Sequence, residues 1–291
     1  MEADPRHAVA FARMEAAWEM AARLRANPPA ITAAPPATDG FGDAWLSRRN
    51  VVGGFVAATL VGGAATAAWR YFGDVELYRT RVGERRAVAL SDGSRVRLNT
   101  ASTIEVAMKK DRRWVHLVQG EALFEVAHDP RRPFLVDAAS ARLRAVGTAF
   151  NVRIRDSVVE LTVTEGMVAV AQAGDYVHKP KGSHIAAGGG AIIRSGAVAP
   201  TVLGGQVLRQ RTAWQDGVIE LDGETLPQAV EEFNRYRTQP IVVGDARLAN
   251  IRVGGRFEVD EADKFLTALE SSFPIDAITS TDGSVMLVAR P

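Results

Sequence analysis

Histidines are the side chains in this 291-residue sequence that would most readily bind a metal ion or transfer a proton at neutral pH. His178 and His184 are the nearest pair. They flank Lys179–Ser183, a segment with proline and glycine that is typical of a turn and fits no helical metal motif. The other histidines are His7, His116 and His128. The chain contains no cysteine, which excludes disulfides, thiolate-bound zinc, iron–sulfur centres and thiol nucleophiles. We therefore expect neither a metal site nor a cofactor.

Two glycine-containing segments could be mistaken for catalytic or phosphate-binding loops. Gly188-Gly189-Gly190 lacks the Lys-Ser/Thr ending of a phosphate loop and opens no helix, so it predicts a turn. In the segment Gly147–Asn151, the first and last residues fit a bend or bulge between strands better than a catalytic site. No nucleophile, histidine and carboxylate can be tied together by their spacing. We therefore expect no enzyme activity.

The charged residues divide the chain into regions of different sign. The formal net charge is only +1, and hydrophobic residues make up 47% of an ordinary globular composition. Residues 1–49 carry six basic and six acidic side chains, residues 70–215 carry 22 and 14, and residues 216–291 carry seven and 14. The overall balance argues against a nucleic-acid binder. The opposite signs of the last two regions suggest two domains with different partners.

An uncharged run of 20 residues, Asn50–Trp69, is long enough as a helix to cross the roughly 30 Å hydrocarbon core of a bilayer. The run has no polar face, which a helix at the surface of a globular domain would normally show. We therefore predict a transmembrane helix at residues 50–69, with a buried core helix as the alternative.

Arg48 and Arg49 directly precede this run and resemble a twin-arginine export signal. They end a linker over residues 28–49, whose first part is rich in alanine and proline. A simple count of the basic residues on both sides favours the reverse orientation, but long following domains translocate largely regardless of charge. We therefore place the N-terminus in the cytoplasm. Ala65-Thr66-Ala67 resembles a cleavage site, so a removable signal is the alternative to the uncleaved anchor that we favour.

One amphipathic helix is predicted before the linker, within residues 1–27. Phe11, Met14 and Trp18 recur at three- and four-residue steps, and the pattern ends before Asn27-Pro28-Pro29. A lone helix of this length cannot bury such a stripe by itself. These three side chains therefore either anchor the helix in a groove of a partner protein or pack inside a helical domain.

Residues 75–199 show the alternation of short β-strands throughout. Arg86–Leu90 and Arg95–Asn99 alternate polar and apolar residues on either side of the turn Ser91–Ser94. Many such strands, separated by glycine, aspartate and proline, predict an all-β domain built as a sandwich, a barrel or a short solenoid. The predicted fold class of the chain is therefore mainly β.

Residues 213–291 change to a mixed pattern that predicts a small α+β domain. The elements follow a β-α-β-β-α-β order. Leu226–Tyr236 and Asp260–Phe273 are the predicted helices, and we expect both on one face of a sheet.

Two strands of this small domain, Ile251–Phe257 and Val285–Val288, could lie at sheet edges and accept a strand from another protein. The alternative is a sheet whose edges are closed off by charge. Ile251, Val253 and Phe257 are our candidate contact residues for such a partner.

A series of short motifs occurs in the β region, and their order and spacing are more specific than any single one. The motifs are Gly83-Glu84-Arg85, Ser91-Asp92-Gly93-Ser94, Leu98-Asn99, Gly120-Glu121-Ala122-Leu123-Phe124-Glu125-Val126, Arg132-Pro133-Phe134, Gly147-Thr148-Ala149-Phe150-Asn151-Val152 and Glu165-Gly166-Met167-Val168. This series resembles the FecR-type anti-sigma regulators of bacterial cell-surface signalling. Trp214, Arg235-Tyr236 and Gly255-Arg256-Phe257 are similar to the family's C-terminal domain, which resembles the short signalling domain of secretins and TonB-dependent transporters.

The resemblance implies a single-pass inner-membrane protein whose N-terminal region holds an extracytoplasmic-function sigma factor in the cytoplasm. It implies two periplasmic domains that sense the signalling domain of a TonB-dependent outer-membrane transporter, usually to regulate iron–siderophore uptake. Release of the sigma factor would involve regulated proteolysis by membrane proteases. Asp4–Phe11 followed by Trp18 looks like the end of the family's sigma-binding domain. We therefore expect that domain to be shortened here, or its start codon to lie upstream.

A second hypothesis keeps the same elements without a transcriptional role, as an exported β-rich binding module of the cell envelope. Cleavage after Ala67 would favour this second hypothesis.

Overall fold

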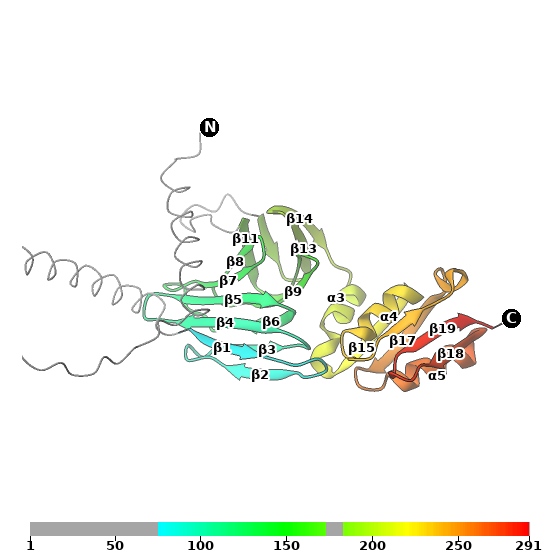
Figure 1. Ribbon diagram of the computed structural model, residues 1–291. Coiled ribbons are helices and arrows are strands. Elements are labelled where there is room, and N and C mark those ends of the chain that lie inside the picture. The colour runs from blue at the N-terminus through cyan, green and yellow to red at the C-terminus, as the bar shows by residue number, and fades with distance from the viewer. Residues whose placement is uncertain (1–74, 173–182, 291) are drawn as a thin grey trace, which may run out of the picture. The chain divides into compact units, whose positions relative to one another are not determined.

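The structure, a computed structural model, describes residues 75–172 and 183–290 (Figure 1). All of them belong to one compact unit. Several predicted features lie outside the described residues, namely Phe11, Met14, Trp18, Arg48, Arg49, the run at residues 50–69 and His178. Within the described part of the chain, no helix combines the length and the hydropathy that crossing a membrane requires.

Seven strands form the first sheet of the β region, here called sheet A. In spatial order they are β1 (Glu76–Arg79), β4 (Thr103–Met108), β5 (Arg113–Gln119), β7 (Phe134–Ala138), β8 (Ala141–Ala145), β11 (Met167–Gln172) and β12 (Ser183–Ala186). Neighbouring strands are antiparallel except β5 and β7, which run parallel with Trp114 opposite Leu135.

Seven further strands form a second sheet, here called sheet B, in which every neighbouring pair is antiparallel. In spatial order they are β14 (Ala197–Val202), β13 (Gly189–Arg194), β10 (Val158–Glu165), β9 (Ala149–Arg155), β6 (Glu121–Glu125), β3 (Arg95–Leu98) and β2 (Arg86–Ala89). Gly188 lies in the turn before β13, whereas Gly189 and Gly190 begin that strand, so only the first of the three glycines matches the predicted turn.

Alternate side chains of the two sheets share one hydrophobic core. Phe124 and Phe150 of sheet B stack with their ring centroids 5.2 Å apart, and Phe134 of sheet A lies 6.2 Å from Phe124. All three rings are fully buried. The β region is therefore a two-layer sandwich, and the prediction of a mainly β chain is confirmed.

Gly120 allows the sharp turn between β5 and β6. Its φ is +86°, in the left-handed region that favours glycine. A Cβ atom placed there would lie 2.3 Å from Ser102 Oγ and 2.6 Å from Ser102 Cα. Because one of these neighbours is backbone, the turn has no room for any other residue.

After β14 the chain changes to short helices and strands. In chain order these are α3 (Gly205–Thr212), the 3-10 helix η1 (Ala213–Asp216), β15 (Val218–Thr225), α4 (Leu226–Asn234), β16 (Ile241–Val243), the 3-10 helix η2 (Ala246–Leu248), β17 (Arg252–Glu258), α5 (Ala262–Ser272), β18 (Ile275–Thr279) and β19 (Val285–Ala289). The sequence did not predict α3, because none of its residues is buried and it therefore carries no apolar stripe.

The strands of this C-terminal region form two small sheets instead of the single sheet that was predicted. β15 pairs with β17, while β16, β19 and β18 form a separate three-stranded sheet in that order. One hydrophobic core collects side chains from both sheets and from α4 and α5. Phe233 of α4 stacks on Phe265 of α5 with their ring centroids 4.0 Å apart, and Phe257 of β17 meets both rings edge-on. The shared core therefore joins the two sheets without a continuous backbone ladder.

A capping box fixes the start of α4. The Thr225 side chain accepts a hydrogen bond from the backbone of Gln228, and the Gln228 side chain accepts one from the backbone of Thr225. Leu226, Val230 and Phe233 occupy one face of the helix and are buried in the C-terminal core. The opposite face, which carries Glu231 and Glu232, is left for contacts with the sandwich.

Candidate functional site: a charged junction between the sandwich and α4

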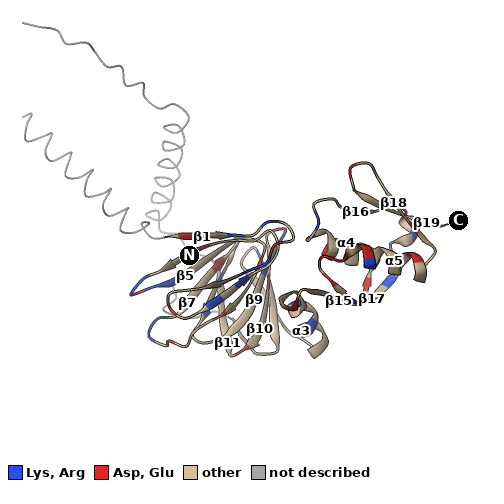
Figure 2. Cartoon of the chain, turned by 90° about the horizontal axis from the view of Figure 1, so that it is seen from below, with Lys and Arg blue, Asp and Glu red and all other residues tan. Residues whose placement is uncertain are grey.

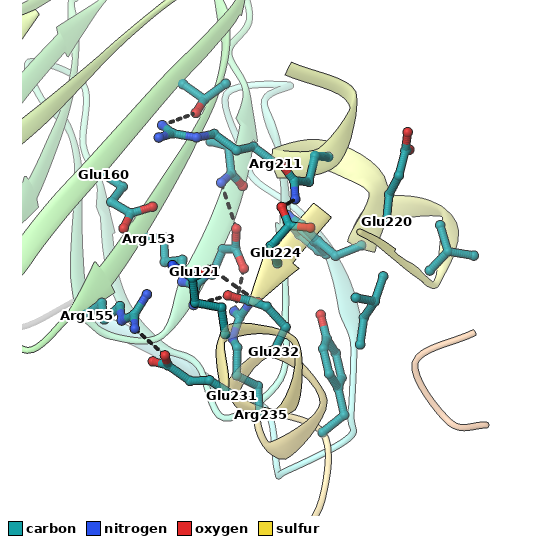
Figure 3. Close-up of a pocket in the computed structure, with 18 residues that line it drawn as sticks. Glu121, Arg153, Arg155, Glu160, Arg211, Glu220, Glu224, Glu231, Glu232 and Arg235 are labelled. Atoms are coloured by element: carbon teal, nitrogen blue, oxygen red, sulfur yellow. Dashed lines mark hydrogen bonds and ion pairs between the residues drawn. The ribbon is translucent and has the colours of Figure 1, made fainter. Parts of the chain in front are cut away.

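Charged side chains of sheet B face charged side chains of α4 (Figure 3). Figure 2 marks the positions of the basic and acidic residues along the backbone, and the charged residues of α4 are acidic. Arg153 of β9 donates two hydrogen bonds to Glu232, with Nη2–Oε1 at 2.8 Å and Nη1–Oε2 at 3.2 Å. Arg235, just after α4, also reaches Glu232, with Nη1–Oε2 at 3.1 Å. The side chains of Arg153, Glu232 and Arg235 are 17%, 27% and 19% exposed. The Glu232 carboxylate therefore binds two arginines, and all three side chains are largely buried.

Glu121, at the start of β6, is the most deeply buried charge of the junction, with 4% of its side chain exposed. Its Oε2 accepts hydrogen bonds from Asn99 Nδ2 at 2.8 Å and from Arg235 Nη2. Its Oε1 accepts one from Asn151 Nδ2 at 2.8 Å. One arginine and two amides therefore satisfy a carboxylate that would be costly to bury alone.

A second set of hydrogen bonds extends the junction to the turn after β3. Asn99 Nδ2 lies 2.9 Å from the Tyr236 hydroxyl oxygen, to which it donates. Thr100 Oγ1 donates to the Arg235 carbonyl oxygen at 2.9 Å and accepts from the Gly83 backbone N–H at 2.8 Å. These contacts hold the C-terminal end of α4 against the sandwich. We call the set formed by Asn99, Thr100, Glu121, Asn151, Arg153, Glu232, Arg235 and Tyr236 the junction cluster.

In the junction cluster, burial and neighbouring charges shift the pKa values of the ionisable side chains in opposite directions. Burial alone would raise the pKa of Glu232, but Arg153 and Arg235 lower it below the ordinary value of 4.5. Burial would lower the pKa of Arg235, yet Glu121 and Glu232 raise it further above the ordinary value. Burial raises the pKa of the Tyr236 hydroxyl despite the nearby Arg235. Glu232 and Arg235 are therefore charged, and Tyr236 is neutral, throughout the physiological pH range.

Strand alternation explains how β9 supplies this site. Phe150 and Val152 point into the sandwich core, so Asn151, Arg153 and Arg155 point to the other face of sheet B. Arg155 forms a further ion pair with Glu231, and both of these side chains are more than 40% exposed. Gly147 lies at the bend before β9, as predicted, but Asn151 lies inside the strand. The interpretation of Asn151 as a bend residue is therefore wrong.

A cavity of about 340 Å³ lies beside the junction cluster (Figure 3). Sheet B contributes Glu160 and Thr162 of β10 to its wall, and the connection to β15 contributes Arg211 and Trp214. Arg211 Nη1 donates to Thr162 Oγ1 at 3.3 Å. The Trp214 carbonyl oxygen accepts a hydrogen bond from Arg85 Nη1 at 3.2 Å. The cavity therefore borders both the sandwich and the connecting segment.

The structure separates the predicted partner residues of the C-terminal region. Val253 is buried in the core, and Phe257 packs against aromatic rings, so neither side chain is presented to a partner. Ile251 precedes β17 and is partly buried. β17 pairs with β15 alone among the described strands, so it is an edge strand. Val285–Val288 lies in β19 between β16 and β18, so the prediction that it forms an edge is wrong.

Sequence reasoning missed the junction cluster. Glu121 and Asn151 lie within motifs that carried the family resemblance, and Trp214 and Arg235-Tyr236 lie among the similar C-terminal residues. Their presence in these motifs was the available signal, because nothing in the local pattern shows which distant residue each one meets. Among the described residues, no three histidine, aspartate or glutamate side chains gather as metal ligands would.

Comparison with known proteins finds a family match within the β region and structural matches that cover more of the chain. Residues 76–169 match the FecR protein family. Two crystal structures of a protein provisionally described as an anti-sigma factor from Parabacteroides distasonis have the same fold, each with a TM-score of 0.61 and 21% sequence identity. The matches cover 75% and 74% of this chain and 100% of the solved chains. No curated protein matches the chain. At this identity the likeness to the solved structures concerns the fold.

Proposed function

We propose that this chain, which belongs to the FecR family through residues 76–169, is an anti-sigma regulator that passes a signal across the bacterial inner membrane. The family match is the observation that carries the proposal. The fold shared with a protein described as an anti-sigma factor supports it. The uncharged run Asn50–Trp69, shortly before the family domain, has the length and composition of a membrane anchor.

In this proposal, residues 1–49 lie in the cytoplasm and bind an extracytoplasmic-function sigma factor. The sandwich and the C-terminal region lie in the periplasm, where the signalling domain of a TonB-dependent outer-membrane transporter meets them. The edge strand β17 offers backbone groups to such a partner by strand addition. Iron–siderophore uptake genes are the proposed targets.

Regulated proteolysis is the proposed switch. A single membrane helix transmits small shifts poorly, whereas its removal releases the sigma factor outright. A protease-resistant segment in place of residues 70–74, between the anchor and β1, should therefore keep the target genes off when the inducing signal is present. A transcriptional reporter for the target genes measures this result.

Co-purification with the sigma factor encoded beside the gene tests the proposal directly. The full chain should retain the sigma factor, and Trp18→Ala should reduce the retained amount at least tenfold if this side chain anchors the helix. Trp45→Ala is the matched control, because it removes the same side chain within the predicted linker. Absence of binding by the full chain, and by a version with an extended start, would contradict the proposal.

Reporter fusions at the two termini test the topology. A fluorescent protein that matures only in the cytoplasm should be active at the N-terminus, and alkaline phosphatase should be active at the C-terminus. The opposite pattern, or release of the mature protein after Ala67, would remove the anchor from the proposal.

A further inference from the structure

Two residues that line the cavity beside the junction cluster each carry a buried polar atom without a hydrogen-bond partner. Trp214 is 5% exposed and its indole Nε1 donates to no atom of the described residues. Asn151 is 3% exposed, and although its Nδ2 binds Glu121, its Oδ1 accepts nothing among the described residues. Buried polar groups in folded proteins are nearly always satisfied. An unused donor and an unused acceptor at one cavity therefore indicate a polar occupant.

Three charged side chains of the cavity also lack an ion pair among the described residues. One of them, Glu224, accepts hydrogen bonds from the Gln210 side chain and from the Asp222 backbone N–H. Arg211 donates to the Thr162 hydroxyl, but the described residues place no carboxylate within 4.0 Å of its guanidinium. The carboxylate of Glu160 forms no hydrogen bond or ion pair with any residue that the structure describes, although its backbone belongs to the ladders of β10. The other arginines of the cavity, Arg153, Arg155 and Arg235, are already paired with glutamates. Apart from the hydrogen-bonded Glu224, the cavity therefore keeps one cation, Arg211, and one anion, Glu160, for an occupant.

The strand register brings these groups together. Thr162 lies directly opposite Asn151 in the β9–β10 pair, and Glu160 is two residues from Thr162 on the same face of β10. Two residues along a strand correspond to about 6.6 Å. Because Arg211 is bound to Thr162, its guanidinium and the Glu160 carboxylate border one small patch of sheet B. Such a patch can be bridged by a molecule that carries both charges a few ångströms apart.

We propose that this cavity binds a small zwitterion of the α-amino acid type. The ligand carboxylate accepts hydrogen bonds from Trp214 Nε1 and from Arg211, and the ligand ammonium donates to Glu160 and to Asn151 Oδ1. A volume of about 340 Å³ accommodates a free amino acid and lies at the lower end of the range of ligand pockets. The bound molecule joins β9 and β10 to the segment that leads into β15, and so strengthens the connection between the sandwich and the C-terminal region.

Ligand-observed NMR and calorimetry with the full chain in mild detergent test this site. The probes are L-alanine, L-glutamine and L-arginine, which share the amino-acid head group and differ in size. Propionate and ethylamine are the half-ligands, because each keeps one charge of alanine and lacks the other. At least one amino acid should bind, and the half-ligands should bind at least tenfold more weakly than alanine or not at all.

Trp214→Phe removes the indole N–H and keeps an aromatic ring, so it should weaken amino-acid binding about tenfold, as expected for one lost hydrogen bond to a charged group. Trp114→Phe is the matched control, because Trp114 lies on β5 of sheet A and does not line the cavity. Arg211→Gln is a second variant that removes the cation and should weaken binding at least as much.

Three outcomes would overturn the proposal. The first is absence of binding by all three amino acids at millimolar concentration, which would mean that water alone fills the cavity. The second is equal binding of alanine, propionate and ethylamine. The third is binding by Trp214→Phe and Arg211→Gln with unchanged affinity. None of these outcomes affects the proposed anti-sigma function, which is tested separately by sigma-factor retention.

Discussion

Arg153 and Glu232 are 79 residues apart in the chain and form a two-point ion pair between β9 of the sandwich and α4 of the C-terminal region. Paired N–H···O bonds of this kind fix both distance and orientation, which a single lysine contact cannot do. The pair therefore determines how α4 lies against sheet B. Its removal should weaken the contact between the two regions more than it weakens the hydrophobic core of either region.

Arg153→Met should lower the free energy of unfolding by about 2 kcal/mol, because it leaves Glu232 with one of its two arginines in a largely buried place. Arg155→Met is the matched control on the same strand. Its partner Glu231 is also on α4, but both side chains are more than 40% exposed, so the loss should be below about 1 kcal/mol. Urea unfolding followed by circular dichroism measures both. Equal losses for the two variants would show that the buried pair has no special part in the junction.

Acid should weaken the junction through Glu232. Its pKa in the folded chain lies below the ordinary value of 4.5, so the unfolded chain takes up the proton first as the pH falls. The contribution of Glu232 to stability is therefore fully present above pH 4.5 and is lost as the pH falls further through the folded pKa. The urea midpoint measured from pH 7 to pH 3 should fall less steeply in Glu232→Gln than in the unchanged chain. A control variant, Glu258→Gln at an exposed position, should keep the full slope. Parallel curves for all three proteins would argue against this role of Glu232.

Gly120→Ala should destabilise the sandwich by about 3 kcal/mol or more, because it combines a left-handed backbone with a clash against Ser102. Gly188→Ala separates the two effects. Gly188 has a φ of +79°, close to that of Gly120, but a Cβ there meets nothing within 4 Å, so only the conformational cost of about 1 kcal/mol remains. Thermal unfolding of the two variants side by side measures the difference. If Gly188→Ala lowered stability as much as Gly120→Ala, the loss in both variants would come from the backbone conformation and not from the clash with Ser102.

Phe257→Ala should reduce the stability of the C-terminal region by about 2 kcal/mol, since the ring packs against Phe233 and Phe265 and is only partly buried. Arg256→Ala, next to it and exposed on the edge strand, should change stability by less than about 0.5 kcal/mol. Hydrogen exchange of the α4 and α5 amides reports the loss locally. If Phe257→Ala left this exchange unchanged, the ring would be free to serve as a contact residue, as its sequence pattern first suggested.

Local patterns predicted most strands of the chain but not their partners. The alternation in Arg86–Leu90 or Phe134–Ala138 is a property of neighbouring residues, so it is visible in the sequence. The parallel pairing of β5 with β7, and the division of the C-terminal strands into two sheets, depend on which apolar faces meet in three dimensions. The sequence also failed to predict α3, because this helix lies at the surface and carries no apolar stripe. Secondary structure was therefore largely predictable, and topology was not.

The junction cluster was hidden for the same reason. Glu121 and Arg235, or Asn99 and Tyr236, are ordinary polar residues until the fold brings them together across 114 and 137 residues. Their presence within the family motifs was visible in the sequence, but a sequence motif does not show which distant residues are in contact. Asn151 shows the consequence, because its type suggested a bend and its actual place is inside β9 with its amide bound to Glu121.

These long separations also determine when the junction forms during folding. A contact between residues more than 100 positions apart can close only after the intervening chain has become compact, so it contributes little to the early transition state. Interactions that are absent from the transition state slow unfolding and leave the folding rate almost unchanged. The junction cluster should therefore lower the rate at which the sandwich and the C-terminal region separate during unfolding. It should have little effect on the rate at which either region folds.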